Sequence, residues 1–241
     1  MSEGNRPRAF PFYIVCDVSS SMWSGYPDNE LTPFDVLGHC VSELLEELEA
    51  KVAVREAAWV SVITFADAAE QVLPLTRLSD AQVVPELKKG QFTNYAAMLR
   101  ELCQAVAADC ERLKNDYKLN QPAVFLLTDG RPEVNGARQP DHDWLPYLEE
   151  LTTASFAYRP NIVTFGFGRA SEATLCRIAT SVRGDKLAYV ADQSVQVTEL
   201  LRQIMNIVYI SIGASIREGV FLPDLPTGMR RAQCDAGVWS S

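Results

Sequence analysis

Residues 12–22 read FYIVCDVSSSM, and this stretch decides how the rest of the chain is interpreted. Five apolar residues run directly into Asp17, and Ser19 and Ser21 follow at alternate positions. A run of this kind is typical of a buried strand that ends in a loop. In open α/β sheets, ligands bind just outside the carboxyl ends of the strands. Asp17, Ser19 and Ser21 are therefore the first candidates for ligand binding.

Outward from this stretch, apolar runs of strand length alternate with longer segments of helical periodicity. The alternation predicts an α/β fold with a mostly parallel, six-stranded sheet and helices on both faces. The run 70–75 follows 59–65 closely enough to pair with it as a hairpin, which predicts one short antiparallel edge strand. The expected strands are 12–16, 59–65, 70–75, 123–128, 161–167 and 186–190, and the expected helices are 37–48, 99–110, 144–156, 172–182 and 195–210.

The composition indicates a folded, mildly acidic protein. The 241 residues are 47% hydrophobic and carry a formal net charge of −9, which excludes disorder as the main state and disfavours nucleic acid and membrane surfaces as partners. The first ten residues are polar, and the apolar segment 204–216 is shorter than the ~20 residues that span a bilayer. We therefore expect a cytoplasmic protein. The six cysteines lie far apart without a C-x-x-C pair, and we expect buried free thiols.

The last part of the chain changes character. Residues 213–241 contain several Pro and Gly residues, yet Phe221, Leu222 and Trp239 keep the segment apolar. We interpret residues 9–212 as one domain and 213–241 as a C-terminal arm or tail. Because a disordered tail seldom carries so many large apolar groups, the arm docks either on its own domain or on another chain. Self-assembly through the arm is one alternative function.

Two further loops carry oxygen donors. Thr93-Asn94 stand before the 99–110 helix, and Thr128-Asp129-Gly130 end the 123–128 strand. Carboxylate and hydroxyl oxygens without Cys or His suit a hard cation such as Mg2+ and suit zinc poorly. The charges of Asp17 and Asp129 would neutralise a divalent cation, which would still attract one more anionic oxygen.

The ordered set Asp17-x-Ser19-x-Ser21, Thr93 and Thr128-Asp129-Gly130 resembles the metal-ion-dependent adhesion site of von Willebrand factor A (vWA) domains. The resemblance implies a Rossmann-like vWA fold and a cation held by Ser19, Ser21 and Thr93, with Asp17 and Asp129 nearby. It also implies that an Asp or Glu of a protein partner supplies the last ligand. Mg2+ is the expected ion, with Mn2+ and Ca2+ as alternatives. Within the family, the chain looks most similar to bacterial TerY-like proteins of tellurium resistance and stress response.

The chain departs from the family pattern in two places. Ser20 stands where many members have glycine, and Gln91-Phe92 precede Thr93 where a glycine pair is common. The second departure makes the loop before Thr93 bulkier and places an apolar ring beside the expected cation.

Four residues near these loops are candidates for contact with a partner: Trp23, Tyr26, Asn94 and Tyr95. The three aromatic side chains either contact a partner or pack the loops.

We expect a binding module and not an enzyme. A Ser/His/Asp hydrolase needs a histidine base, and His39 and His142 lie in a helical pattern and an acidic loop, without a G-x-S-x-G motif. The alternative is a Mg2+-dependent phosphotransferase or phosphatase with Asp17 as nucleophile. Such an enzyme would carry a second carboxylate where this chain has Ser19.

Overall fold

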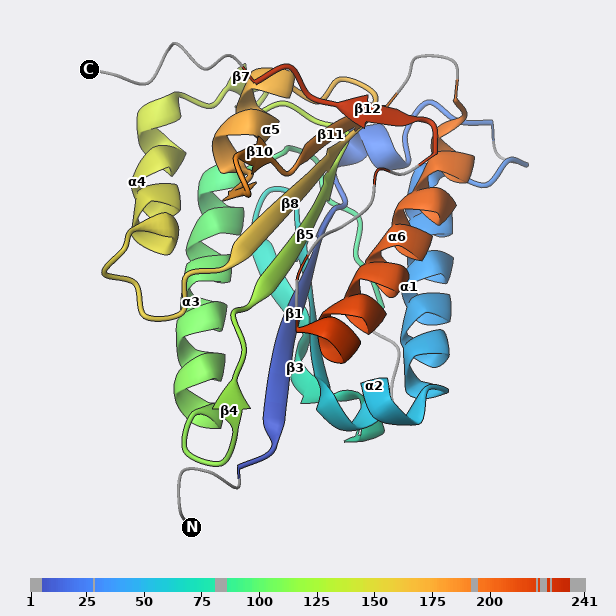
Figure 1. Ribbon diagram of the computed structural model, residues 1–241. Coiled ribbons are helices and arrows are strands. Elements are labelled where there is room, and N and C mark those ends of the chain that lie inside the picture. Colours follow the sequence, from blue (N-terminus) through green and yellow to red (C-terminus); the bar gives the residue numbers. More distant parts are fainter. Residues whose placement is uncertain are drawn as a thin grey trace.

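The computed structural model describes residues 6–27, 29–80, 86–191, 195–219, 221, 225 and 227–234. Within these residues, eight strands form one central sheet in the order β12-β11-β8-β5-β1-β2-β3, with short β4 paired to β1 (Figure 1). The strands are β1 (Arg8–Asp17), β2 (Ala58–Phe65), β3 (Ala69–Arg77), β4 (Lys118–Leu119), β5 (Ala123–Thr128), β8 (Asn161–Gly166), β11 (Ala188–Ala191) and β12 (Met229–Arg231). β3 and β12 pair antiparallel at the two edges, and the other neighbours are parallel. The predicted α/β fold with a mostly parallel sheet is confirmed, but the sheet has eight strands where six were predicted and two antiparallel edge strands where one was predicted.

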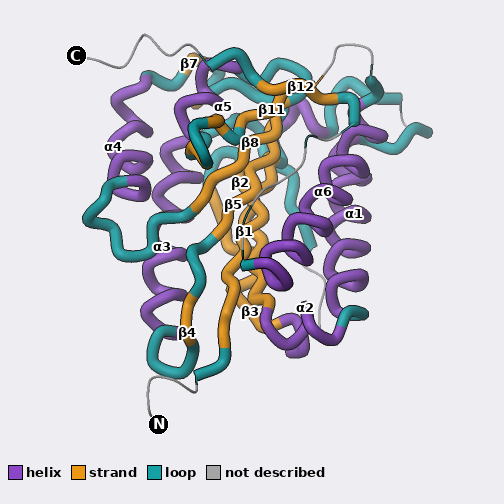
Figure 2. Tube along the Cα trace, in the orientation of Figure 1, coloured by secondary structure: helices purple, strands orange, loops and turns teal. Residues whose placement is uncertain are grey.

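Helices cover both faces of the sheet (Figure 2). α1, α2 and α6 share one apolar cluster with one face, and α3 and α4 share another with the opposite face. α5 packs against β8 and β11. The α-helices are α1 (Pro33–Glu49), α2 (Val52–Ala57), α3 (Tyr95–Leu113), α4 (Asp141–Thr152), α5 (Glu172–Ile178) and α6 (Val197–Glu218). The described residues also contain two short 3-10 helices, η2 (Ser20–Met22) and η3 (Leu78–Asp80). Two small hairpins lie outside the main sheet: β6 (Glu133–Val134) with β7 (Ala137–Arg138), and β9 (Ser181–Val182) with β10 (Asp185–Lys186).

β1 lies at the centre of the sheet and is buried from Ala9 to Asp17. It pairs in parallel with β2 on one side and with β5 on the other. The register places Asp17 opposite Phe65 and Cys16 opposite Leu127, so Asp17 leaves the sheet level with Thr128. Because a strand buried on both faces tolerates no shift in register, this pairing fixes where the carboxyl ends of β1 and β5 meet.

Several elements differ from the sequence prediction for local reasons. α3 begins at Tyr95, because the Asn94 side chain accepts a hydrogen bond from the Ala97 amide and caps the helix. α5 ends at Ile178, because Ala179 adopts an extended conformation with φ −62° and ψ 138°. Arg183 and Gly184 then adopt positive φ angles and turn the chain back as the β9–β10 hairpin. The short strands β4 and β12 and the six-residue helix α2 lack a hydrophobic period long enough to predict them.

Part of the C-terminal segment docks on its own domain. The predicted boundary at residue 212 falls inside α6, which continues to Glu218 and ends at Gly219 with a left-handed φ of 70°. Phe221 packs against Phe125 of β5, with ring centroids 5.6 Å apart. β12 then extends the sheet beside β11. Leu222 and Trp239 lie outside the described residues.

The expectation that every cysteine is a free thiol is wrong for one pair. Cys176 of α5 and Cys234 form a disulfide that joins positions 58 residues apart. Pairing of β12 with β11 brings the two cysteines together, and nothing in their sequence spacing indicates this. Cys16, Cys40, Cys103 and Cys110 are free and buried, as predicted.

None of the helices in the described part of the chain has the length and apolar character needed to cross a membrane.

Candidate functional site

The first wall of the candidate site is the turn that follows β1. Asp17 is fully buried, and its Oδ1 accepts a hydrogen bond of 2.9 Å from the Ser19 amide. The η2 turn then folds the chain back, so that Ser19 Oγ and Ser21 Oγ lie 3.3 Å apart. The alternate spacing of Asp17, Ser19 and Ser21 therefore brings their side chains together, as the sequence predicts.

The end of β5 forms the second wall. Ser21 Oγ donates a hydrogen bond of 2.7 Å to Asp129 Oδ1, and Thr128 Oγ1 donates one of 2.6 Å to Asp17 Oδ2. One hydrogen-bonded cluster thus contains two carboxylates and three hydroxyls, drawn from two adjacent parallel strands. The role of Thr128 as a donor to Asp17 is not evident from sequence, because a threonine that ends an apolar strand is usually a packing residue.

Thr93 forms the third wall. It pairs with Glu133 through two backbone hydrogen bonds, from Thr93 N to Glu133 O and from Glu133 N to Thr93 O. Its side chain lies against Gly130, where an added Cβ would come within 2.5 Å of Thr93 Oγ1. Because Gly130 directly follows Asp129, the Thr93 hydroxyl lies beside the carboxylate cluster. The structure therefore brings all five predicted metal residues to one edge of the sheet.

The two carboxylates repel each other in a buried environment. Burial raises the pKa of Asp17, and the charge of Asp129 raises it further. Burial also raises the pKa of Asp129, against the opposing effects of the Ser21 hydrogen bond and the charge of Arg169. Neither carboxylate forms an ion pair with a side chain that the structure describes. Two buried anions without an ion-pair partner favour a bound cation, so the donor set fits a hard divalent ion.

The described residues contain no group of three or more His, Cys, Asp or Glu side chains that would hold a metal ion. This is consistent with the candidate site, which has only two carboxylates and otherwise presents hydroxyls. Its chemistry therefore differs from that of carboxylate-rich or histidine-rich metal centres.

Tyr95 packs beneath the end of β5, on the buried side of the site. It is fully buried among Phe65 and Trp144, and its hydroxyl lies 3.4 Å from both Thr128 Oγ1 and Gly130 O. A side chain without exposed surface cannot reach a partner. Of the two alternatives left open by the sequence, the structure gives Tyr95 the packing role.

Asn94 and Gln139 hold the Thr93 loop in place. Asn94 caps α3, donates from its amide to Asp67 O, and accepts a hydrogen bond from Gln139 Nε2. Gln139, which is buried, accepts a hydrogen bond from the Tyr95 amide. The Asn94 side chain is thus used within the loop, and no sequence signal identified Gln139.

Trp23 and Tyr26 lie on the outer side of the β1–α1 connection. Trp23 is half-buried and donates from Nε1 to Gly90 O, with the Lys89 ammonium 5.5 Å from its ring centroid. Tyr26 is 38% exposed, and its pKa is raised by partial burial and by the charge of Asp129. Tyr26 therefore lies at the rim of the site with part of its side chain exposed to solvent.

The loop with the unusual Gln91-Phe92 pair packs closely despite its bulk. Ser20 N donates to Gln91 O, and Gly90 N donates to Val18 O, which joins this loop to the β1 turn. An added Cβ on Gly90 would lie only 2.2 Å from the Ala66 Cβ. Gly90, the residue before Gln91-Phe92, is therefore the glycine that lets this loop pack closely against Ala66.

Comparison with known proteins agrees with this geometry. Residues 12–131 match the model of the von Willebrand factor type A domain family, and this segment contains all five candidate metal residues. A search of curated protein sequences gives no significant match.

Solved structures show the same fold at low sequence identity. A von Willebrand factor type A protein from Catenulispora acidiphila aligns with a TM-score of 0.58 at 15% identity, over 86% of this chain and 43% of that one. Proximal thread matrix protein 1 of the mussel byssus aligns with a TM-score of 0.54 at 18% identity, over 87% of this chain and 49% of that one. The ArnB paralog VWA2 from Sulfolobus acidocaldarius aligns with a TM-score of 0.52 at 15% identity, over 84% of this chain and 46% of that one. The chain spans less than half the length of each of these proteins.

The fold and the family match define a Rossmann-like α/β domain of the vWA type. The part of the chain that carries the candidate site, residues 12–131, is a von Willebrand factor type A domain.

The contact between Gly130 and Thr93 can be tested by substitution. Gly130→Ala should lower the free energy of unfolding by about 1–3 kcal/mol, because its Cβ would overlap the Thr93 side chain. In a Thr93→Ala background the same substitution should cost less, which urea unfolding of the double-mutant cycle would measure. Gly38→Ala is the matched control, since its Cβ meets only Leu87 Cδ1 at 4.0 Å. Equal costs of Gly130→Ala in the two backgrounds would contradict the contact.

The raised carboxyl pKa values predict a specific pH dependence in chelator-treated protein. A group with a higher pKa in the folded than in the unfolded state stabilises the fold at low pH, and this contribution is lost as the pH rises through the folded pKa. The free energy of unfolding should therefore rise as the pH falls from 8 to 5, and Asp17→Asn should flatten this rise. Urea unfolding at a series of pH values would measure it. Equal pH dependence in both proteins would contradict the burial of an ionisable Asp17 beside Asp129.

Proposed function

We propose that this chain is a cation-dependent protein-interaction module. The cation is Mg2+, or alternatively Mn2+ or Ca2+, and Ser19, Ser21 and Thr93 hold it through their hydroxyls with Asp17 and Asp129 nearby. When bound, the cation offers an open position to a carboxylate oxygen of a partner protein. The observation that supports this most strongly is the pair of buried carboxylates in a hydroxyl cluster, without an ion-pair partner among the described residues.

The hydrogen-bond directions favour hydroxyl ligands. Ser21 Oγ gives its proton to Asp129 Oδ1, so its lone pairs remain available to a cation. Asp17 uses Oδ1 to accept from the Ser19 amide and Oδ2 to accept from Thr128. Asp17 therefore acts mainly by its negative charge and by ordering the turn.

The proposed partner supplies an Asp or Glu side chain. The whole chain is acidic, with a net charge of −9, so long-range attraction to an acidic partner is absent. Recognition then depends on the local charge of the cation and on contacts at the rim, where Tyr26 and the half-buried Trp23 lie. Partner binding should accordingly need the cation.

The finer assignment rests on sequence resemblance alone. The likeness to TerY-like proteins suggests a stress-response or tellurium-resistance complex in the bacterial cytoplasm as the setting for this interaction. Stable disulfides are typical of oxidising surroundings, and cytosolic disulfides are mostly transient. In the cytoplasm, the Cys176–Cys234 disulfide would therefore be expected to form and break.

The geometry argues against the alternative in which Asp17 is a phosphoryl-accepting nucleophile. Asp17 has no exposed surface, and both of its oxygens already accept hydrogen bonds. A nucleophile needs an oxygen that can approach phosphorus in line. This supports a binding role and not a phosphotransferase.

Metal titration tests the proposed site directly. Calorimetry with Mg2+ and Mn2+ should show one binding event in the unaltered chain, and Asp17→Asn and Thr93→Ala should each weaken it at least ~10-fold, because each removes a charge or a ligand. Ser79→Ala is the control, since Ser79 is an exposed hydroxyl in η3 outside the site. Unchanged affinity in both site variants would refute the assignment.

A phosphate mimic distinguishes the enzymatic alternative. With beryllofluoride and Mg2+, we expect no adduct on Asp17 by intact mass or by fluorine NMR, because the carboxylate is buried and hydrogen-bonded on both oxygens. A stable adduct that is absent from Asp17→Asn would support the phosphotransferase.

A further inference from the structure

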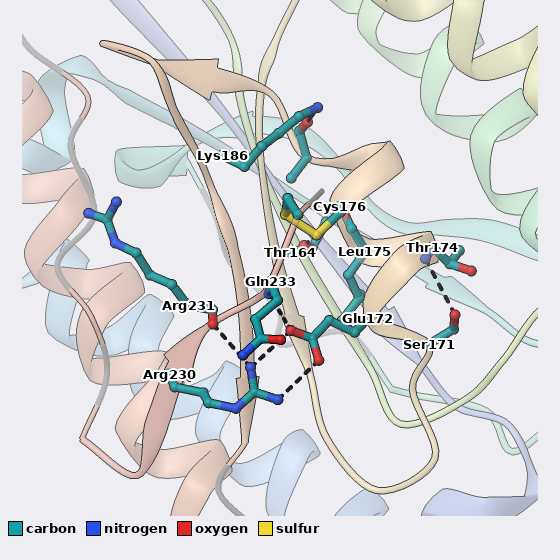
Figure 3. Close-up of a disulfide and its surroundings, with 12 residues drawn as sticks. Thr164, Ser171, Glu172, Thr174, Leu175, Cys176, Lys186, Arg230, Arg231 and Gln233 are labelled. Carbon is teal, nitrogen blue, oxygen red and sulfur yellow. Dashed lines mark hydrogen bonds and ion pairs between the residues drawn. A yellow bond between two sulfur atoms is a disulfide. The ribbon is translucent and has the colours of Figure 1, made fainter. Parts of the chain in front are cut away.

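A disulfide fastens the C-terminal strand to the rest of the domain. Cys176 lies on α5, and Cys234 lies three residues beyond the end of β12, so the bond joins the helix to the edge of the sheet (Figure 3). Cys234 is partly exposed, next to the exposed Gln233. The bond is therefore placed where a thiol reductant in solution can approach it.

The described noncovalent contacts of β12 are the buried Met229 side chain, a short pairing with β11, and ion pairs near the surface, among them Arg231 with Asp185. β12 pairs with β11 over only three residues, and Ala232 N adds one hydrogen bond to Ala188 O. Arg230 forms a two-pronged ion pair with Glu172, which also accepts from the Gln233 amide (Figure 3). Exposed single ion pairs contribute little to stability, and a bidentate arginine–carboxylate pair contributes more. The covalent bond is the restraint on β12 that a change in redox state can remove.

The remaining free cysteines are protected from reaction. All four are buried, and burial raises the pKa of Cys40, Cys103 and Cys110. Since the thiolate is the reactive form, these side chains should not exchange with the disulfide in the folded protein. Cys176 and Cys234 therefore form an isolated redox pair.

We propose that Cys176 and Cys234 are a reversible redox site, which locks β12 onto the sheet when oxidised and releases it when reduced. The reductant is a dithiol of the thioredoxin class or a small dithiol. Its thiolate attacks one sulfur and displaces the other as a thiolate, and its second thiol then resolves the mixed disulfide. The products are two protein thiols and one oxidised reductant, so two electrons and two protons are transferred to the protein.

Release changes the surface of the domain at one edge. β11 then exposes the backbone hydrogen-bonding groups that β12 now pairs, from Ala188 to Ala191. Met229, which is buried in the main apolar cluster, leaves its place. An uncovered strand edge is a template for an added strand, so reduction regulates an edge that is closed in the oxidised chain.

The test compares oxidised and reduced forms of the full chain. Native alkylation with maleimide should label no cysteine before treatment, and after dithiothreitol it should label Cys176 and Cys234 only, as read by peptide mass spectrometry. Hydrogen exchange in segments 188–191 and 229–231 should become at least ~10-fold faster on reduction and recover when oxidised glutathione restores the bond. Cys234→Ser should show the fast exchange without reductant, and Cys103→Ser should behave like the unaltered chain.

Three results would overturn the proposal. The disulfide is a permanent structural bond and not a redox site if it resists dithiothreitol in the folded chain. The disulfide does not form if Cys176 and Cys234 are both alkylated even after treatment with oxidised glutathione. The disulfide does not hold β12 if exchange in 188–191 and 229–231 is the same in both redox forms.

Discussion

The burial of the Asp17 carboxylate at the end of the central strand is the constraint on which the site depends. β1 is held on both sides by parallel partners, so Asp17 cannot move toward solvent without loss of register. Its two oxygens accept hydrogen bonds from the Ser19 amide and the Thr128 hydroxyl, which order the turn and join β1 to β5. The cost of a buried negative charge beside Asp129 is partly offset by these hydrogen bonds, and a divalent cation would offset the rest.

The sequence was informative where chemistry and periodicity coincide. The apolar run 12–16 and the D-x-S-x-S array predicted both the first strand and the candidate site, because residues two apart converge in the turn after a strand. Thr93 and Asp129 were predicted from their positions at element ends, and the structure brings them to the same edge. Asp17 ends one parallel strand and Asp129 follows another, and the polar ends of such strands lie together, while the resemblance to the vWA site added Thr93, which precedes α3.

The residues that sequence could not identify act through tertiary contacts. Gln139 supports the Thr93 loop from 45 residues away, since its amide binds Asn94. Tyr95 was a candidate for partner contact but is buried, because the start of α3 turns its ring beneath the site. The Cys176–Cys234 bond depends on a three-residue strand with no apolar period.

The loop between β8 and α5 also borders the site: Arg169 N donates to Asp129 O, and Gly168 lies against the Asp129 Cβ. The loop that leads into the disulfide-bearing helix α5 is thus next to a proposed metal residue.

A crystal structure of the chain grown with Mn2+ would show whether a cation binds at the Asp17 cluster, because the anomalous signal of manganese locates the ion independently of the protein density. We expect one anomalous peak within coordination distance of the hydroxyl oxygens of Ser19, Ser21 and Thr93, and its loss in Asp17→Asn crystals. A peak elsewhere with these hydroxyls unligated, or a peak that persists at the same position in Asp17→Asn, would contradict it.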